Sequence, residues 1–144
     1  MIKIGFIGLG IMGAPMAGHL LTAGPEGFLY DINPLDKSLL SQGGIPCLSF
    51  KDVALRADII ILMVPDTPNV ADALFAEGGV AAGLSPGKIV VDMSSISPIE
   101  TKEFSKKIEA LGCEYLDAPV SGGEVGAKAA SLTIMVGGPQ AAFD

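Results

Sequence analysis

The run Gly8-Leu9-Gly10-Ile11-Met12-Gly13 decides how this chain begins to fold. An apolar segment at residues 2–7 precedes the run and is short enough for one buried strand. Apolar residues at helical spacing follow it as far as Gly24, which stands where a helix C-cap glycine belongs. A strand, a glycine turn and a helix form the context in which the spacing G-x-G-x-x-G predicts a dinucleotide site.

Each glycine of the run has its own expected role. Gly8 permits the sharp turn, Gly10 lets a pyrophosphate approach bare backbone, and Gly13 lets the helix pack closely on the strand. The free N–H groups and the positive end of the helix dipole then face the phosphates. The alternative interpretation is a glycine turn that binds no ligand.

The acidic residue Asp31 follows a second predicted strand at residues 28–30. In a dinucleotide-binding fold, a carboxylate at this place accepts hydrogen bonds from the adenosine ribose hydroxyls. It also repels a 2′-phosphate by about 1 to 4 kcal/mol at ~4 Å, which is roughly tenfold to a thousandfold in affinity. The nearest basic residue that follows is Lys37. We therefore expect NAD as the cofactor, with NADP possible; the alternative is a turn aspartate before Asn33-Pro34.

Strand and helix patterns alternate along the rest of the chain. Further strands are expected at residues 45–48, 58–64, 88–92, 113–116 and 132–136, and helices at 35–42, 51–57, 70–77 and 97–111. Residues 65–69 are expected to form a turn at the carboxyl edge of the sheet, where open α/β sheets bind ligands. The pattern predicts one domain over residues 1–144, with an α/β, Rossmann-like, doubly wound and mostly parallel sheet.

Composition and charge exclude several function classes. The formal charge of −7 argues against a nucleic-acid partner or an anionic membrane surface. No apolar run approaches the length of a membrane span. Cys47 and Cys113 form no C-x-x-C pair, so neither a metal site nor a disulfide is indicated. We expect both to be buried, reduced thiols in a cytoplasmic protein.

A second glycine-rich segment, residues 117–127, follows the predicted strand at 113–116. Successive amides at Ser121, Gly122 and Gly123 can form a nest for an anion, with the Ser121 hydroxyl as a further donor. A small carboxylate fits that description. On spacing alone, a purely structural loop is an equal alternative.

Two segments carry a resemblance to a known family. Residues 5–13 with Pro15-Met16, and Asp117-Ala118-Pro119-Val120-Ser121-Gly122-Gly123, are similar to the signatures of the β-hydroxyacid dehydrogenases. The resemblance implies hydride transfer between NAD(H) and a small β-hydroxy acid or semialdehyde, by a homo-oligomeric enzyme. Residues 63–68, 92–98 and 123–129 most resemble the members that reduce tartronate semialdehyde to glycerate. Oxidation of 3-hydroxyisobutyrate is the alternative, and a non-catalytic nucleotide-binding module is an alternative of another class.

The same resemblance implies roles for individual residues. The backbone of Gly10, Ile11 and Met12 would hold the pyrophosphate, and Asp31 the adenosine ribose. Val64, Pro65 and Asn69 would border the cofactor, and Ser95 would lie beside its nicotinamide half. The substrate carboxylate would be bound by Ser121, Gly122 and Gly123.

The catalytic residue that the resemblance implies is missing from this sequence. In the family, the general acid is a lysine within a Gly-x-x-x-Lys-x-x-Asn motif, on a helix of a second, all-helical domain. The sequence contains no such motif, so no catalytic residue is expected among residues 1–144. We therefore expect the chain to be the cofactor domain of a longer enzyme.

Overall fold

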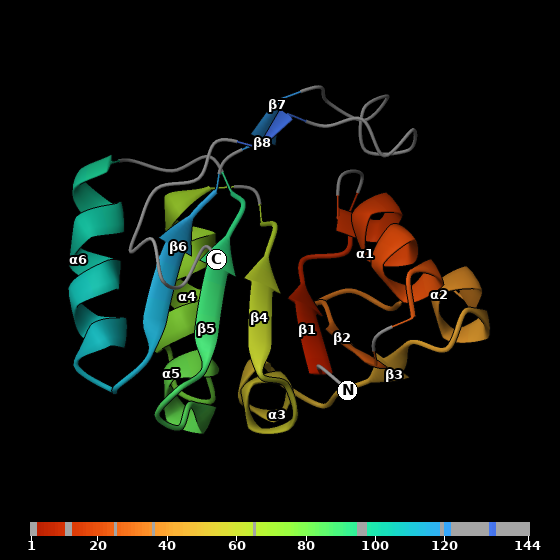
Figure 1. Cartoon of the computed structure of the whole chain (residues 1–144), viewed down its shortest axis with the longest axis horizontal. Helices are drawn as coiled ribbons and strands as arrows, with labels where there is room; N and C mark the ends of the chain where they lie inside the picture. Colours follow the sequence, from red (N-terminus) through yellow and green to blue (C-terminus); the bar gives the residue numbers. More distant parts are fainter. Residues whose placement is uncertain are drawn as a thin grey trace.

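A six-stranded parallel sheet with helices on both faces forms the framework of the computed structural model (Figure 1). The structure describes residues 3–10, 13–24, 26–35, 37–64, 66–94, 98–118, 120–121 and 133–134. The strand order β3-β2-β1-β4-β5-β6 is that of a doubly wound Rossmann-like sheet, as the sequence predicts. From β1 the chain adds β2 and β3 on one side of the sheet, and it then adds β4, β5 and β6 on the other side. The topological switch point therefore lies between β1 and β4.

The bounds of the elements are as follows. The strands of the sheet are β1 (Lys3–Ile7), β2 (Glu26–Tyr30), β3 (Ile45–Pro46), β4 (Ile59–Leu62), β5 (Ile89–Asp92) and β6 (Glu114–Asp117). The helices are α1 (Gly13–Thr22), α2 (Lys37–Ser41), α3 (Phe50–Arg56), α4 (Thr67–Phe75), α5 (Val80–Gly83) and α6 (Pro98–Glu109). A separate antiparallel pair consists of β7 (Val120–Ser121) and β8 (Thr133–Ile134).

The core has two layers because the central strands are buried on both faces. Alternate residues of β1 serve the two layers: Phe6 joins the cluster under α1 and α2, and Ile7 joins the larger cluster under α3 to α6. Within the larger cluster, Phe104 of α6 packs on Phe75 of α4 with ring centroids 5.4 Å apart. The Lys107 ammonium lies over the same Phe75 ring, 4.9 Å from its centroid.

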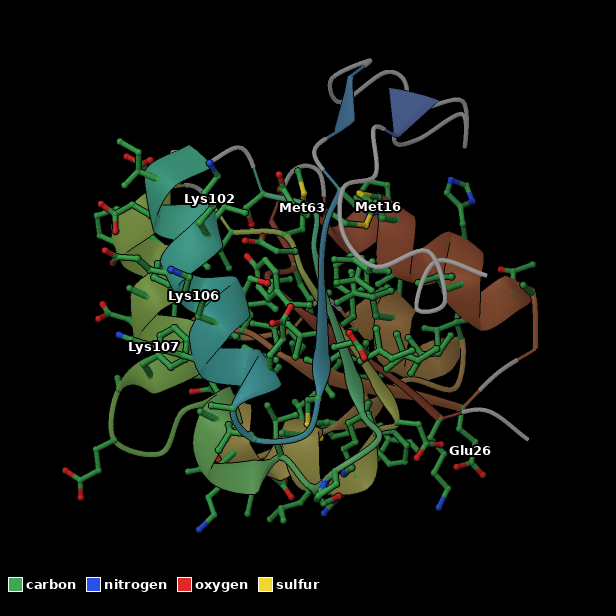
Figure 2. All side chains as sticks on the ribbon, turned by 60° about the vertical axis from the view of Figure 1, so that its left-hand side comes forward. Met16, Glu26, Met63, Lys102, Lys106 and Lys107 are labelled. Carbon is green, nitrogen blue, oxygen red and sulfur yellow. The ribbon has the colours of Figure 1, made fainter. Side chains whose placement is uncertain are left out.

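The carboxyl ends of the parallel strands share one edge of the sheet. In Figure 1 the arrowheads of β1, β4, β5 and β6 point to this edge, and the β7–β8 pair lies beyond it. Figure 2 shows Met63, which follows β4, and Met16 of α1 at the same end of the molecule. Both side chains pack against the smaller core cluster. The edge therefore brings together the start of α1 and the segments that follow β4 and β5.

Several predicted boundaries are wrong, and each has a physical reason. α4 begins at Thr67, so Pro68 and Asn69 lie in its first turn; proline is tolerated there because that turn needs no intrahelical N–H partner. The four-residue helix α5 is too short to give a periodic pattern. The strand predicted at 132–136 contains β8, which pairs antiparallel with β7 outside the main sheet. α2 and β3 are shorter than predicted.

Candidate functional site

Two glycines of the turn after β1 are required by packing. Gly8 has φ +94°, and a Cβ on it would lie 2.2 Å from the carbonyl oxygen of Met63. A Cβ on Gly13 would lie 1.7 Å from the carbonyl oxygen of Gly8. No side chain fits at either distance. Gly8 therefore packs the turn onto the segment after β4, a contact that the sequence did not predict. Gly13 lets α1 pack closely on the turn and on Phe6 of β1, as the sequence predicts.

Gly10 is different because its surroundings are open. It is exposed, and a Cβ on it would meet no heavy atom within 4 Å among the described residues. Its carbonyl oxygen accepts a hydrogen bond from the Ala14 N–H at 3.0 Å, at the start of α1. The first turn of α1 contains no acidic residue, so the positive end of the helix dipole is not neutralised. A pyrophosphate needs such an open backbone at a helix start.

The Asp31 carboxylate connects the end of β2 with the glycine turn. Its Oδ2 accepts a hydrogen bond from the Leu9 N–H at 2.5 Å, and its Oδ1 accepts one from the Asn33 N–H at 2.9 Å. The bond to Asn33 is the turn role that was the alternative interpretation of Asp31. Each carboxylate oxygen keeps acceptor capacity for a further donor, such as a ribose hydroxyl. Both roles are therefore compatible with the same side chain.

The segments after β4 and β5 are joined by a buried hydrogen bond. The half-buried Val64 donates its N–H to Ser94 Oγ at 2.9 Å. The Val64 side chain also borders the glycine turn, because a Cβ on Gly8 would lie 3.0 Å from Val64 Cγ1. Asn69 is exposed in the first turn of α4, where its N–H donates to the Asp66 carbonyl at 3.0 Å.

A buried polar network, which sequence reasoning missed, lies behind this edge. Asp92 and Ser94 are fully buried. Asp92 Oδ1 accepts from the Ser94 N–H at 3.0 Å, and Asp92 Oδ2 accepts from the Tyr115 hydroxyl at 2.6 Å. In the sequence, the network is indicated only by Asp92 at the end of one buried strand and Tyr115 inside the next. The register of β5 and β6 is needed to show that the two side chains meet.

Burial sets the protonation behaviour of this network. Burial raises the pKa of the Asp92 carboxyl, and the hydrogen bonds from Tyr115 and Ser94 oppose that shift. Burial and the Asp92 charge raise the pKa of the Tyr115 hydroxyl, so it remains a donor at neutral pH. Asp117, the partner of Asp92 in the β5–β6 register, has its pKa raised by burial and by the Asp92 charge.

The structure places only part of the predicted site. It brings Gly8, Gly13 and Val64 into contact and connects Asp31 to the same turn through Leu9. It places the Ser121 backbone in β7, paired with β8. The predicted residues that lie outside the described part of the chain are Ile11, Met12, Pro65, Ser95, Gly122 and Gly123.

The described residues hold no candidate metal site and no candidate membrane span. No three histidine, cysteine, aspartate or glutamate side chains converge there in a way that could hold a metal ion. In that same part of the chain, no helix combines the length and apolar character needed to cross a bilayer. Cys47 and Cys113 are free and buried, as predicted.

Known proteins are similar to this chain in sequence and in fold. Residues 3–144 match the family described as the NAD binding domain of 6-phosphogluconate dehydrogenase. The 2-hydroxy-3-oxopropionate reductase of Escherichia coli (strain K12) is 52% identical over 143 residues, covering 99% of this chain and 49% of the relative.

Two solved structures superpose closely on the chain. The Mycobacterium tuberculosis 3-hydroxyisobutyrate dehydrogenase with L-serine has a TM-score of 0.91 at 35% identity, over 99% of this chain and 48% of that one. Psf3 in complex with NADP+ and 2-OPP has a TM-score of 0.92 at 30% identity, over 97% of this chain and 50% of that one. These likenesses confirm the Rossmann-like fold and the resemblance to β-hydroxyacid dehydrogenases. The chain spans about half the length of the curated relatives it matches.

Proposed function

Because the chain belongs to the family of the NAD binding domain of 6-phosphogluconate dehydrogenase, we propose that it is the cofactor domain of a longer oxidoreductase. That enzyme transfers a hydride between NAD(H) and a small β-hydroxy acid or semialdehyde. One observation carries the dinucleotide part of the proposal: packing requires glycine at Gly8 and Gly13 but leaves the backbone of Gly10 open. An open glycine between two packed ones, at the start of a helix, supports close approach of a ligand to the backbone.

The residues of this chain bind and orient the cofactor. The Gly10 backbone and the start of α1, with Ile11 and Met12, hold the pyrophosphate, and Asp31 accepts hydrogen bonds from the adenosine ribose. Val64, Pro65, Asn69 and Ser95 border the rest of the dinucleotide. The nicotinamide supplies the hydride chemistry when bound. Ser121, Gly122 and Gly123 hold the substrate carboxylate, and the proton donor lies outside residues 1–144.

The preferred substrate is tartronate semialdehyde, which the enzyme reduces to glycerate. The support is the 52% identity with a 2-hydroxy-3-oxopropionate reductase, against 40% with the mitochondrial 3-hydroxyisobutyrate dehydrogenase of Bos taurus. Steady-state kinetics of the complete enzyme test this choice, with both substrates compared in the direction of reduction: tartronate semialdehyde against the semialdehyde that corresponds to 3-hydroxyisobutyrate. We expect a kcat/KM at least about tenfold higher for tartronate semialdehyde, equivalent to about 1.4 kcal/mol. A preference for the other semialdehyde would overturn it, and no turnover of either would favour a non-catalytic module.

The preferred cofactor is NAD, because the Asp31 carboxylate stands where a 2′-phosphate would lie. Separate titrations with NADH and NADPH test this point. We expect NADH to bind at least about tenfold more tightly. Tighter binding of NADPH would contradict the role given to Asp31 and leave the dinucleotide site itself intact.

The assembly and location of the enzyme are also proposals. We propose a homo-oligomer, on the strength of the family resemblance, and a cytoplasmic location, which the two free buried cysteines support. The molar mass from light scattering tests the first, and cell fractionation the second.

A further inference from the structure

The carboxyl ends of β4, β5 and β6 are joined through one buried polar group. We propose that Asp92 and Ser94 are positioning residues for the nicotinamide half of the bound dinucleotide. They act by fixing the backbone after β4 against the backbone after β5. This inference rests on the proposed function, because it concerns the same dinucleotide.

The hydrogen bonds of the network span long stretches of sequence. Val64 donates to Ser94 Oγ from 30 residues away, and the Tyr115 hydroxyl donates to Asp92 from 23 residues away. The Ala118 N–H donates to the Asp92 carbonyl at 2.8 Å, so the start of the segment after β6 is held by the same residue. Asp92 thus bonds β6 and the segment after it directly, and it is linked to the segment after β4 through Ser94.

Burying a carboxylate here is costly, and packing alone would favour an apolar side chain. Asp92 is fully buried, yet its carboxylate is satisfied by the Tyr115 hydroxyl and by the backbone and side chain of Ser94. A fully satisfied polar network specifies one arrangement of its parts more strictly than apolar packing does. The network therefore fixes a geometry.

The geometry that it fixes lies on the nicotinamide side of the edge. Asp31, at the end of β2, marks the adenosine end, and the glycine turn after β1 marks the pyrophosphate. The other end of the dinucleotide must continue across the switch point toward β4 and β5. Val64 lies against the glycine turn on that side. Ser94 is fully buried, so it acts through the Val64 backbone and does not touch the cofactor.

The test compares NADH with ADP-ribose, which has the adenosine and pyrophosphate but no nicotinamide. The Ser94→Ala variant of the full chain leaves the half-buried Val64 N–H without its partner. We expect its NADH affinity to fall about tenfold, while its ADP-ribose affinity stays within about twofold. The matched control is Ser105→Ala, which removes a hydroxyl bonded to Glu109 on the exposed face of α6. We expect it to change neither affinity.

A second variant covers the case in which Ser94→Ala does not fold. Tyr115→Phe keeps the aromatic ring in the core and removes one donor from Asp92. We expect a smaller loss of NADH affinity, about threefold, again without loss of ADP-ribose affinity. Equal losses for both ligands, or no loss for either, would overturn the positioning role. A wild-type chain that binds neither ligand would overturn the proposed function and this inference with it.

Discussion

The two halves of the sheet build their shares of the carboxyl edge by different means. In the half formed by β3, β2 and β1, the edge is shaped by backbone: Gly8 and Gly13 leave no room for a side chain. In the half formed by β4, β5 and β6, the edge is held by the buried side chains of Asp92, Ser94 and Tyr115. The shape of the edge thus depends on steric contacts in the first half. In the second half it depends on hydrogen bonds between residues of different strands.

The largest expected effect comes from filling the backbone contact in the first half. Gly13→Ala places a Cβ 1.7 Å from the Gly8 carbonyl oxygen, and backbone on both sides must move. We expect the free energy of unfolding in urea to fall by about 3 kcal/mol or more.

Gly10→Ala is the matched control, because the added methyl group meets no described atom within 4 Å. We expect its free energy of unfolding to stay within about 1 kcal/mol of the wild-type value. Its NADH affinity should nevertheless fall at least about tenfold, since the methyl group occupies the space of the pyrophosphate. Equal destabilisation by both substitutions would contradict the division of roles.

The next effect concerns the Asp31 carboxylate, which accepts a hydrogen bond from the glycine turn in the first half. Asp31→Asn puts an amide NH₂ against either the Leu9 N–H or the Asn33 N–H, so one bond is lost. We expect a loss of about 1 to 3 kcal/mol in the free energy of unfolding, and about tenfold less discrimination between NADH and NADPH.

Asp58→Asn is the control for that substitution. Asp58 also accepts a hydrogen bond from a backbone N–H, that of Lys3 at 3.3 Å, but in an exposed position. We expect its free energy of unfolding to stay within about 0.5 kcal/mol of the wild-type value. A change in NADH discrimination in this variant would mean that the effect of Asp31 is not local.

The contrast between the halves also explains what could be predicted from the sequence. The roles of Gly8 and Gly13 follow from a spacing of a few residues, because the turn and the helix start are local structures. Asp31 was predictable for a related reason: the length of one strand–helix–strand unit places it beside the turn. The doubly wound parallel sheet, though not its strand order, followed from the alternation of strand and helix patterns.

The second half could not be predicted in the same way. The bond from Val64 to Ser94 depends on the register of β4 and β5, and the bond from Tyr115 to Asp92 on that of β5 and β6. Side-chain alternation indicates which residues face inward, but not which of them meet across strands. The start of α4 was mispredicted because Pro68 indicates a turn and a first helical turn equally well.

A smaller effect appears in how stability depends on pH in the second half. Burial raises the pKa of the carboxyls of Asp92 and Asp117 above their ordinary value of 3.8. Between pH 3.8 and the raised pKa of the folded chain, these carboxyls are ionised in the unfolded chain but still protonated in the folded chain. The free energy of unfolding therefore falls with rising pH in this window and levels off above it.

The comparison of wild type with Asp92→Asn isolates the contribution of Asp92 and of its coupling to Asp117, since contributions from the other carboxyls cancel in the difference. We expect the free energy of unfolding of the wild type to fall relative to that of Asp92→Asn as pH rises, because asparagine mimics the protonated carboxyl and does not titrate. Urea melts between pH 4 and pH 7 measure it. A difference that stays constant across that range would contradict the raised pKa.

A last effect concerns the two halves through their cysteines, and the difference expected between Cys47 and Cys113 is smaller than the effects above. Burial, and then the Asp52 charge, raise the pKa of the Cys47 thiol to about 11, against the Arg56 charge and a hydrogen bond from Leu29. Burial also raises the pKa of the Cys113 thiol, against a hydrogen bond and the charge of Lys88. At pH 8, roughly one Cys47 thiol in a thousand is then ionised, against about one in four in the unfolded chain. We expect an aromatic disulfide reagent to modify the native chain at least about a hundredfold more slowly than the chain in urea. The single variants Cys47→Ser and Cys113→Ser separate the modification rates of the two thiols. We expect Cys47 to be modified more slowly than Cys113. Faster modification of Cys47 would mean that the β3 side of the sheet opens more often than the β6 side.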